Sequence, residues 1–429
     1  MRTSTSRGPV VTTDPADFPI EPLRHPRFDN AMSLPDELIL GRYRSFAGRI
    51  SLPLKPITLV YGTNNAGKSA LLRALAFLGT SLEDDGAPEL RLPEAAFHDT
   101  TFSKLAWRGD AADYRWMLGL RWTNCPVREV IYTLNSASDT NPWIRSMELQ
   151  RSDSSRWSAR EGESRALVDP ESTAPIPLHR LVPEFPALAD LRAQLLELRG
   201  KIRWLSAVRA SAPAVIPRGT ISPPSSGDGA AAYQMIAEDA DLRNKVARYY
   251  EALTPPRTLE VHEALPSGRY LTISPASQPG WRVALRDTGE GMTQVMPVLA
   301  YAEQTARDGG ILAVEEPESH LHPDAQRLLA RHLCELASRT KGSRFVLETH
   351  SRVFLLAVQL EVALGHLEAD DVRIVWVDQS PSGRSDVTVI PLRKSGRPGD
   401  GWPPSALAED LQLAREFTRA HAPSKKDDE

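Results

Sequence analysis

The sequence GTNNAGKS, residues 62–69, decides the fold that we expect for this chain. It fits the pattern G-x-x-x-x-G-K-[ST], in which glycines let the backbone wrap a phosphate so that successive N–H groups point at the anion. The apolar run ITLVY (57–61) before it predicts a strand, and AGKSALLRALAFLG (66–79) has the apolar spacing of a helix. A loop that ends at a helix N-terminus favours an anion, so a chance glycine turn is the weaker interpretation.

The residue types in this loop indicate what each of them does in a nucleotide site. We expect the Lys68 ammonium to neutralise the outer phosphate oxygens and the Ser69 hydroxyl to bind Mg²⁺. The residues that we expect to bind the nucleotide are Gly62, Asn64, Asn65, Ala66, Gly67, Lys68 and Ser69.

A second apolar run, ILAV (311–314), ends in the acids Glu315, Glu316 and Glu318. Ligands of open α/β sheets bind beyond the C-terminal ends of the strands, so we expect these carboxylates near the phosphate loop. We predict that Glu315 lies in the Mg²⁺ shell and that Glu316 polarises or deprotonates the attacking water. Glu318 can take either role. A solvated acidic turn would be the preferred interpretation if the phosphate loop were absent.

Histidines follow these acids in two places. His320 and His322 come directly after the acidic turn, but no further ligand stands at a fixed spacing, which makes a zinc site a weak interpretation. A loop that contacts a partner subunit is the interpretation we prefer. His350 comes just past the apolar run FVL (345–347). A lone histidine is commonly structural, but this position predicts that His350 reaches the γ-phosphate or the attacking water.

Composition excludes several classes of protein. Of the 429 residues, 41% are hydrophobic, which suffices for a buried core and excludes wholesale disorder. The 51 basic residues are balanced by 55 acidic ones, which argues against a globally basic nucleic-acid-binding surface. The two cysteines lie too far apart in the sequence to indicate a disulfide framework. No apolar run is long enough for a membrane helix and no signal-peptide core follows Met1, so we expect a cytoplasmic protein without a membrane partner.

Four motifs in the same order resemble those of the ATP-binding-cassette-like ATPase heads of the SMC and OLD-nuclease group. The resemblance is strongest to compact bacterial AAA-type ATPases found near phage-defence genes. YGTNNAGKS (61–69) resembles their phosphate loop, RDTGEGMTQVMPVL (286–299) their signature motif, AVEEPESHLHPDAQ (313–326) their Walker B motif, and ETHS (348–351) their histidine switch. The resemblance implies an α/β P-loop NTPase fold with a mixed sheet, and ATP and Mg²⁺ as cofactors.

The resemblance also implies that the signature motif acts on the nucleotide of a second subunit. Gly289, Gly291 and Thr293 are the residues that would reach it, so that ATP closes a dimer or larger assembly and hydrolysis by Glu316 and His350 reopens it. The chain departs from the usual motifs in three places: Glu315 stands where the group usually has Asp, no clear glutamine marks the loop that should sense Mg²⁺, and the signature lacks its leading serine.

The resemblance divides the chain into five segments. They are a flexible N-terminal arm (1–33), the first part of the ATPase head with the phosphate loop (34–108), an insertion of strands and helices (109–280), the second part of the head with the other three motifs (281–378), and a small C-terminal appendage (379–429). The appendage includes Gly401, Trp402 and Pro403, which resemble the tail of one branch of the group.

The function implied is an ATPase, expected to be slow, that gates a separate effector in anti-phage defence or DNA surveillance. The segment after His350 is too short for the nuclease domain of the OLD group, which is why we expect a separate effector. The alternative is a scaffold that holds ATP with little turnover and presents a toxin or nuclease partner. An ATPase subunit of a membrane transporter fits the signature sequence TGEGMTQ poorly.

Contact with DNA is a further hypothesis. The region 180–218 is locally basic and could line a groove, although arginines on a helix are more commonly a solvated face. Its basic residues are Arg180, Arg192, Arg199, Lys201, Arg203, Arg209 and Arg218.

Overall fold

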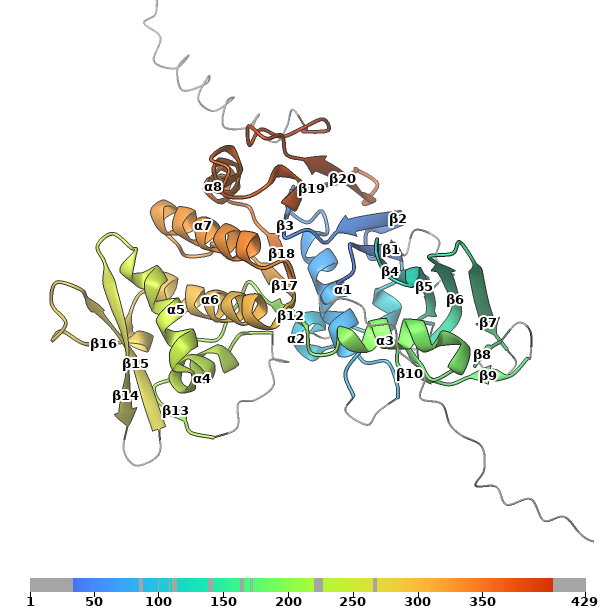
Figure 1. Cartoon of the computed structure of the whole chain (residues 1–429), viewed down its shortest axis with the longest axis horizontal. Helices are drawn as coiled ribbons and strands as arrows, with labels where there is room; N and C mark the ends of the chain where they lie inside the picture. Colours follow the sequence, from blue (N-terminus) through green and yellow to red (C-terminus); the bar gives the residue numbers. More distant parts are fainter. Residues whose placement is uncertain are drawn as a thin grey trace, which may run out of the picture. The chain divides into compact units, whose positions relative to one another are not determined.

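The computed structural model (Figure 1) describes residues 34–403 except 85–87, 99, 108, 110–113, 138–141, 163–165, 170, 172, 220–226 and 265–267. The expected N-terminal arm (1–33) and the part of the expected appendage that follows Pro403 lie outside the described residues.

A six-stranded sheet carries the phosphate loop. Its first five strands run parallel and the last is antiparallel, so the sheet is mixed, as expected. The parallel strands deliver the phosphate loop, the acidic turn and the ETHS segment to one edge of the sheet, because the C-terminal ends of parallel strands lie together. In spatial order the strands are β12 (Ile202–Leu205), β17 (Gly310–Glu315), β18 (Ser343–Glu348), β3 (Ile57–Gly62), β19 (Val372–Gln379) and β20 (Ser385–Pro391).

Two hydrophobic cores cover the two faces of this sheet. Leu312 and Val314 of β17 belong to the core that the C-terminal helices complete, whereas Ile311 and Ala313 face the core that contains α1. The run ILAV (311–314) of β17 is therefore apolar without interruption, as is typical of a strand buried on both faces. Figure 1 shows the C-terminal helices on one side of the sheet and α1 on the other. The helices are α1 (Lys68–Thr80), α6 (Glu290–Asp308), α7 (Pro323–Arg339) and α8 (Arg352–Ala363).

An eight-stranded antiparallel sheet packs on the α1 side. It pairs β1 with β4 across the expected boundary at 108/109, so residues on both sides of that boundary share one sheet. The expected insertion 109–280 therefore does not form one unit, and its strand β12 lies in the central sheet. In spatial order the strands are β2 (Phe46–Pro53), β1 (Glu37–Tyr43), β4 (Arg115–Arg121), β5 (Val127–Asn135), β6 (Trp143–Arg151), β7 (Arg156–Glu161), β8 (Leu167–Val168) and β9 (Pro175–Ile176).

A third, four-stranded sheet and two helices stand beside α6 and α7. Helix α5 packs against strand β14 of this sheet and against α6. These elements are β13 (Ile216–Pro217), β14 (Arg257–Ala264), β15 (Gly268–Pro275), β16 (Val283–Ala284), α4 (Ala231–Glu238) and α5 (Ala240–Glu251). The remaining elements are α2 (Glu94–Phe97), α3 (Ala189–Glu197), the pair β10 (Leu178–His179) and β11 (Val182–Pro183), and 3-10 turns at Phe102–Lys104, Pro186–Leu188, Leu285–Asp287 and Ala369–Asp371.

The described part of the C-terminal appendage is joined to the central sheet. Strand β20 pairs with β19, and Trp402 of the Gly-Trp-Pro sequence packs near Trp376, with 6.3 Å between the ring centroids. The segment from 379 onward thus begins inside the head. Within the described ranges, we find no helix whose length and apolar content would let it cross a membrane.

Candidate functional site

The phosphate loop joins β3 to α1 through backbone conformations that favour glycine. Gly67 has a φ of 97° and precedes the first helical residue, Lys68. A Cβ on Gly67 would lie 2.6 Å from the Ser45 Oγ, and a Cβ on Gly62 would lie 2.0 Å from the Val377 carbonyl oxygen. Side chains are therefore excluded at both positions, and the backbone amides before α1 can face an anion.

A cavity of about 820 Å³ opens over this loop, within the range of sites that hold small ligands. Gly62 and the fully buried Ala66 belong to the phosphate loop but do not line this cavity. The cavity brings the end of β3 together with the ends of β17 and β18, which follow β3 by more than 200 positions in the sequence. Its lining includes Asn64, Asn65, Gly67, Lys68, Ser69, Arg73, Glu316, Glu348 and His350.

The Lys68 ammonium is held by the loop itself. Its Nζ donates to the carbonyl oxygens of Thr63 (2.6 Å) and Gly62 (3.1 Å). Burial lowers the pKa of Lys68, while the carboxylates of Glu348 and Glu316 raise it. A phosphate that replaced the carbonyl contacts would give this buried cation a full counter-charge, which favours anion binding.

Glu315 and Glu316 are adjacent in sequence but have different surroundings. The Glu315 carboxylate forms a two-point ion pair with Arg73, at 2.9 Å from Nε and 3.1 Å from Nη2, and does not line the cavity. Glu316 does line the cavity, and its Oε2 accepts a hydrogen bond from the Ser319 hydroxyl at 2.9 Å. The predicted water-activating residue is therefore on the cavity side, while the metal role of Glu315 stays a prediction.

The backbone at Glu316 is strained. Its φ is 44°, a conformation that costs about 1–3 kcal/mol for a residue other than glycine. The buried Arg209 guanidinium holds this turn, because its Nη2 donates to the carbonyl oxygens of Glu315 (2.6 Å) and Glu316 (2.9 Å). Strain that the surroundings maintain is common at functional sites, and here it directs the Glu316 side chain into the cavity.

Glu348 is a site residue that the sequence analysis missed. The Ser69 hydroxyl donates to its Oε1 at 2.8 Å, and its buried Oε2 has no hydrogen-bond partner among the described residues. Burial and the nearby charge of Glu315 raise the pKa of Glu348 to about 7. The signal was present in the sequence: Glu348 directly follows the apolar run FVL (345–347), as Glu315 follows ILAV (311–314).

These groups fit a Mg²⁺ site that a nucleotide completes. A serine hydroxyl and a carboxylate with a free oxygen are ligands that Mg²⁺ uses in phosphate sites. Across the described ranges, no group of three or more His, Cys, Asp or Glu side chains is arranged to hold a metal ion. The ion would therefore need phosphate oxygens in addition to Ser69 and a nearby carboxylate.

His350 lies at the cavity, and Glu318 fixes the loop that carries it. The Glu318 Oε1 accepts hydrogen bonds from the Thr349 hydroxyl (2.7 Å) and from the backbone amides of His350 (3.0 Å) and Ser351 (3.1 Å). Burial, together with the charge of Lys68, lowers the pKa of His350, which favours the neutral imidazole at neutral pH. Glu318 is therefore a positioning residue for His350.

We expect the substitution Glu318→Ala to lower ATP turnover about tenfold, since residues that orient a site from behind typically contribute that much or more. ATP affinity should stay unchanged, because Glu318 does not line the cavity. Steady-state turnover and nucleotide binding measure the two quantities separately. Glu318→Gln retains an acceptor oxygen and serves as the matched control with a smaller loss. Unchanged turnover in Glu318→Ala would show that the loop does not need this carboxylate.

The signature residues stand away from this cavity. Gly289 precedes α6 and is exposed, and Gly291 approaches the Walker B loop so closely that a Cβ there would lie 2.5 Å from the His320 carbonyl oxygen. Thr293 differs from the expectation: it is only 7% exposed, and its hydroxyl donates to the Glu290 carbonyl oxygen at 3.0 Å. An apolar helix face buries Thr293, whereas Gly289 and Glu290 of this motif are exposed.

The histidines of the Walker B loop have other partners than a metal. The Nδ1 of His320 lies 3.0 Å from the Glu290 carboxylate, and the His322 ring caps the first turn of α7. With no metal-binding cluster in the residues that the structure describes, the zinc interpretation finds no support.

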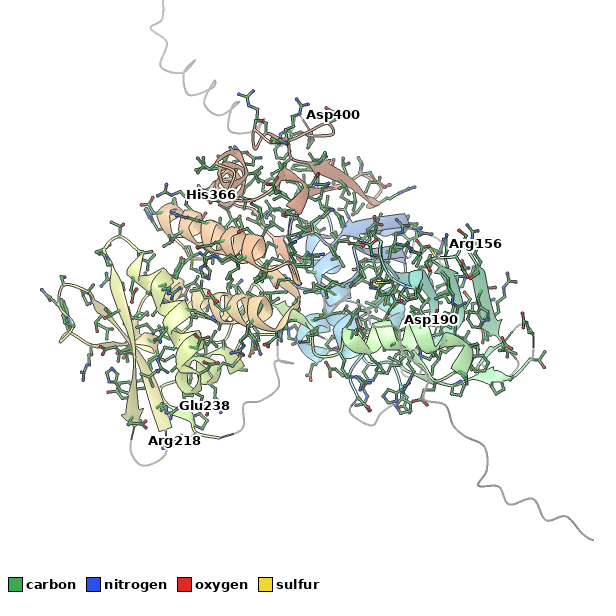
Figure 2. All side chains as sticks on the ribbon, viewed as in Figure 1. Arg156, Asp190, Arg218, Glu238, His366 and Asp400 are labelled. Carbon is green, nitrogen blue, oxygen red and sulfur yellow. The ribbon has the colours of Figure 1, made fainter. Side chains whose placement is uncertain are left out.

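Three of the seven basic residues that were expected to line a DNA groove in the region 180–218 are buried. Arg180, Arg203 and Arg209 are 2%, 7% and 4% exposed and serve internal contacts. Figure 2 places Arg218 beside the third sheet, far across the view from Asp190 of α3, the helix that carries Arg192. The arginines that lie close together in this part of the sequence are therefore partly buried and partly far apart in the structure.

Comparisons with known proteins agree with this geometry. Residues 238–357, which contain the signature, Walker B and ETHS segments, match the family described as "AAA domain, putative AbiEii toxin, Type IV TA system". No curated protein matches the chain significantly. The family match confirms the resemblance to AAA-type P-loop ATPases, and the loop and sheet described above confirm the P-loop NTPase fold.

Several solved structures are similar to the chain at low identity. An SMC head bound to the C-winged helix domain of ScpA has a TM-score of 0.47 and 14% identity, over 84% of this chain and 98% of that one. The SMC head domain from Thermotoga maritima has a TM-score of 0.41 and 11% identity, over 84% and 99%. An Smc head domain with an extended coiled coil, bound to the C-terminal domain of ScpA derived from Pyrococcus furiosus, has a TM-score of 0.46 and 12% identity. The match covers 90% of this chain and 100% of that one.

Proposed function

We propose that this chain is an ATPase switch in which two copies close on ATP and Mg²⁺ and thereby gate a separate effector protein. One observation carries the proposal: Lys68, Ser69, Glu316 and His350 line a single cavity, although they come from the ends of three strands. A cation, a metal-binding hydroxyl, a carboxylate base and a neutral imidazole are the groups that phosphoryl transfer to water uses.

Each residue has a defined part in this mechanism. Lys68 and the amides that precede α1 bind the phosphate oxygens. Glu316, oriented by the Ser319 hydroxyl, accepts a proton from the attacking water. The His350 imidazole contacts the same water or the γ-phosphate. Ser69, with Glu348 nearby, would hold a Mg²⁺ ion together with phosphate oxygens, and that ion would supply charge neutralisation for the transferred phosphate.

The dimer follows from where the signature segment stands. Gly289 and Gly291 lie outside the cavity of their own chain, while the N-terminus of the 19-residue helix α6 is exposed beside them. Free amides at a helix N-terminus attract an anion, so this end of α6 suits the γ-phosphate bound by a second copy. Closure would then need ATP on the facing chain, and hydrolysis would release it.

The effector and the biological setting rest on the family description. The matching family is described by a toxin of a type IV TA system, which supports a separate partner protein. Phage defence, which follows from the sequence resemblance alone, and a place in the cytoplasm extend this proposal. A scaffold that holds ATP with little turnover remains the second candidate. The observation that favours the scaffold is the ion pair between Arg73 and Glu315. Because Glu315 is the carboxylate of the Walker B motif, this pair competes with its predicted role in the Mg²⁺ shell.

We expect Glu316→Gln to form a dimer or larger closed assembly only when ATP and Mg²⁺ are present, because the variant binds but does not hydrolyse the nucleotide. Light-scattering mass with and without ATP-Mg²⁺ measures this, and Lys68→Ala is the control that should not respond. If the mass stays constant while ATP binds, closure around the nucleotide is wrong for this chain. Turnover by the native chain then decides between the ATPase and the scaffold.

A further inference from the structure

A second cavity, of about 370 Å³, lies between α5, α6 and α7, away from the nucleotide site. Its floor is apolar and includes Leu328 and Leu336 of α7 and Tyr249 of α5. Figure 1 shows α5 beside α6 on this side of the central sheet. The nucleotide site described above uses none of the residues that line this cavity.

The rim of this cavity has an excess of positive charge. Lys245, Arg248, Arg331 and Arg339 line it, against the acids Glu303 and Glu335. Glu335 is already paired with Arg339, and the buried Glu303 carboxylate lies 3.2 Å from the His332 Nε2. In contrast, the exposed guanidinium groups of Arg248 and Arg331 have neither an ion pair nor a hydrogen bond to any residue that the structure describes.

An apolar floor between two free arginines is complementary to an acidic amphipathic helix. Apolar side chains of such a helix would bury Leu328 and Leu336, and its carboxylates would pair with the two guanidinium groups, which bind carboxylates in two-point geometry. A nucleic-acid backbone fits less well, because it offers no apolar side chains for the floor and would approach the Glu335 carboxylate.

Helix α5 connects this cavity to the segments that carry the signature and Walker B motifs. The Tyr250 hydroxyl donates to the Met292 carbonyl oxygen (2.7 Å) in the first turn of α6, which carries the signature. The adjacent Tyr249 hydroxyl donates to the Ala325 carbonyl oxygen (3.0 Å) in the first turn of α7, which follows the Walker B loop. A shift of the signature relative to Walker B would therefore move α5, and with it one wall of the cavity.

We propose that this cavity is the docking site for an acidic amphipathic helix of the effector protein, and that α5 makes its affinity depend on the nucleotide state. The inference rests on the proposed ATPase switch for the nucleotide dependence alone. The docking chemistry depends only on Arg248, Arg331 and the apolar floor.

The docking site is tested with a fluorescent peptide that has glutamates on one helical face and leucines on the other, bound to the full chain without nucleotide. We expect saturable binding, which the double reversal Arg248→Glu and Arg331→Glu weakens about tenfold or more. Arg327→Glu is the matched control, because Arg327 is an exposed arginine of α7 that does not line the cavity. ATP binding should be unchanged in all of these variants.

Three outcomes would overturn the docking site. They are no binding of the peptide, an equal loss in Arg327→Glu, and competition by mixed-sequence double-stranded DNA that is stronger than competition by unlabelled peptide. The nucleotide link is tested with ATP-Mg²⁺ in Glu316→Gln, where peptide affinity should change and where adding Tyr249→Phe and Tyr250→Phe should remove the change. If ATP closes the dimer but leaves peptide affinity constant, the link is wrong and the ATPase switch stands.

Discussion

Replacing Glu316 by glutamine should reduce ATP turnover by about 100-fold or more, the usual contribution of a positioned general base. Glutamine has nearly the same shape and keeps an oxygen that the Ser319 hydroxyl can reach, so the turn with its positive φ should survive. The amide, however, cannot accept a proton from water. The measurement is steady-state phosphate release together with the dissociation constant for ATP, which we expect to remain close to that of the native chain.

The matched control for this experiment is Glu197→Gln. Glu197 is an exposed acid at the end of α3 and does not line the cavity, so its loss should leave turnover within a few-fold of the native rate. A Glu316→Gln variant that turns over ATP at the native rate would remove Glu316 from the mechanism. The remaining acids to consider would then be Glu348 in the cavity and Glu315 beside it.

The features that the sequence predicted correctly are those that local patterns encode. The strand, glycine loop and helix at 57–79 form as expected, because apolar periodicity and glycine conformations act within a few residues. The acidic turn and the ETHS segment lie at the same sheet edge because they end buried parallel strands. Because Glu316 and His350 each follow such a strand directly, their positions in the sequence were enough to predict that both lie at one cavity.

The features that the sequence did not predict depend on contacts between distant segments. The pairing of β1 with β4 joins strands about 70 positions apart, and no local signal marks it, so the boundary at 108/109 divided one sheet. The arginines at 180 and 203 were interpreted as surface charge because sequence does not show burial. The motif that named Glu315 as the metal-side acid gave no indication that Arg73 would pair with it.

The second large effect concerns Glu348. Replacing it by glutamine should raise the Mg²⁺ concentration needed for half-maximal turnover and lower turnover by about 100-fold, the upper range for groups that tune a metal ligand. The reason is that Glu348 is the carboxylate in contact with the Ser69 hydroxyl, and its Oε2 is free among the described residues. Turnover titrated with Mg²⁺ at saturating ATP, and ATP binding with and without Mg²⁺, measure the two effects.

The matched variant is Glu315→Gln, which changes the other carboxylate at the same level of the sheet. It breaks the ion pair with Arg73 and should lower thermal stability, because a charged and partly buried guanidinium loses its partner. Its Mg²⁺ requirement should change less than that of Glu348→Gln. Glu348→Gln should fold at least as well as the native chain, since it removes a buried charge that repels Glu315. The reverse pattern of Mg²⁺ requirements would return the metal role to Glu315, as its place in the Walker B motif implies.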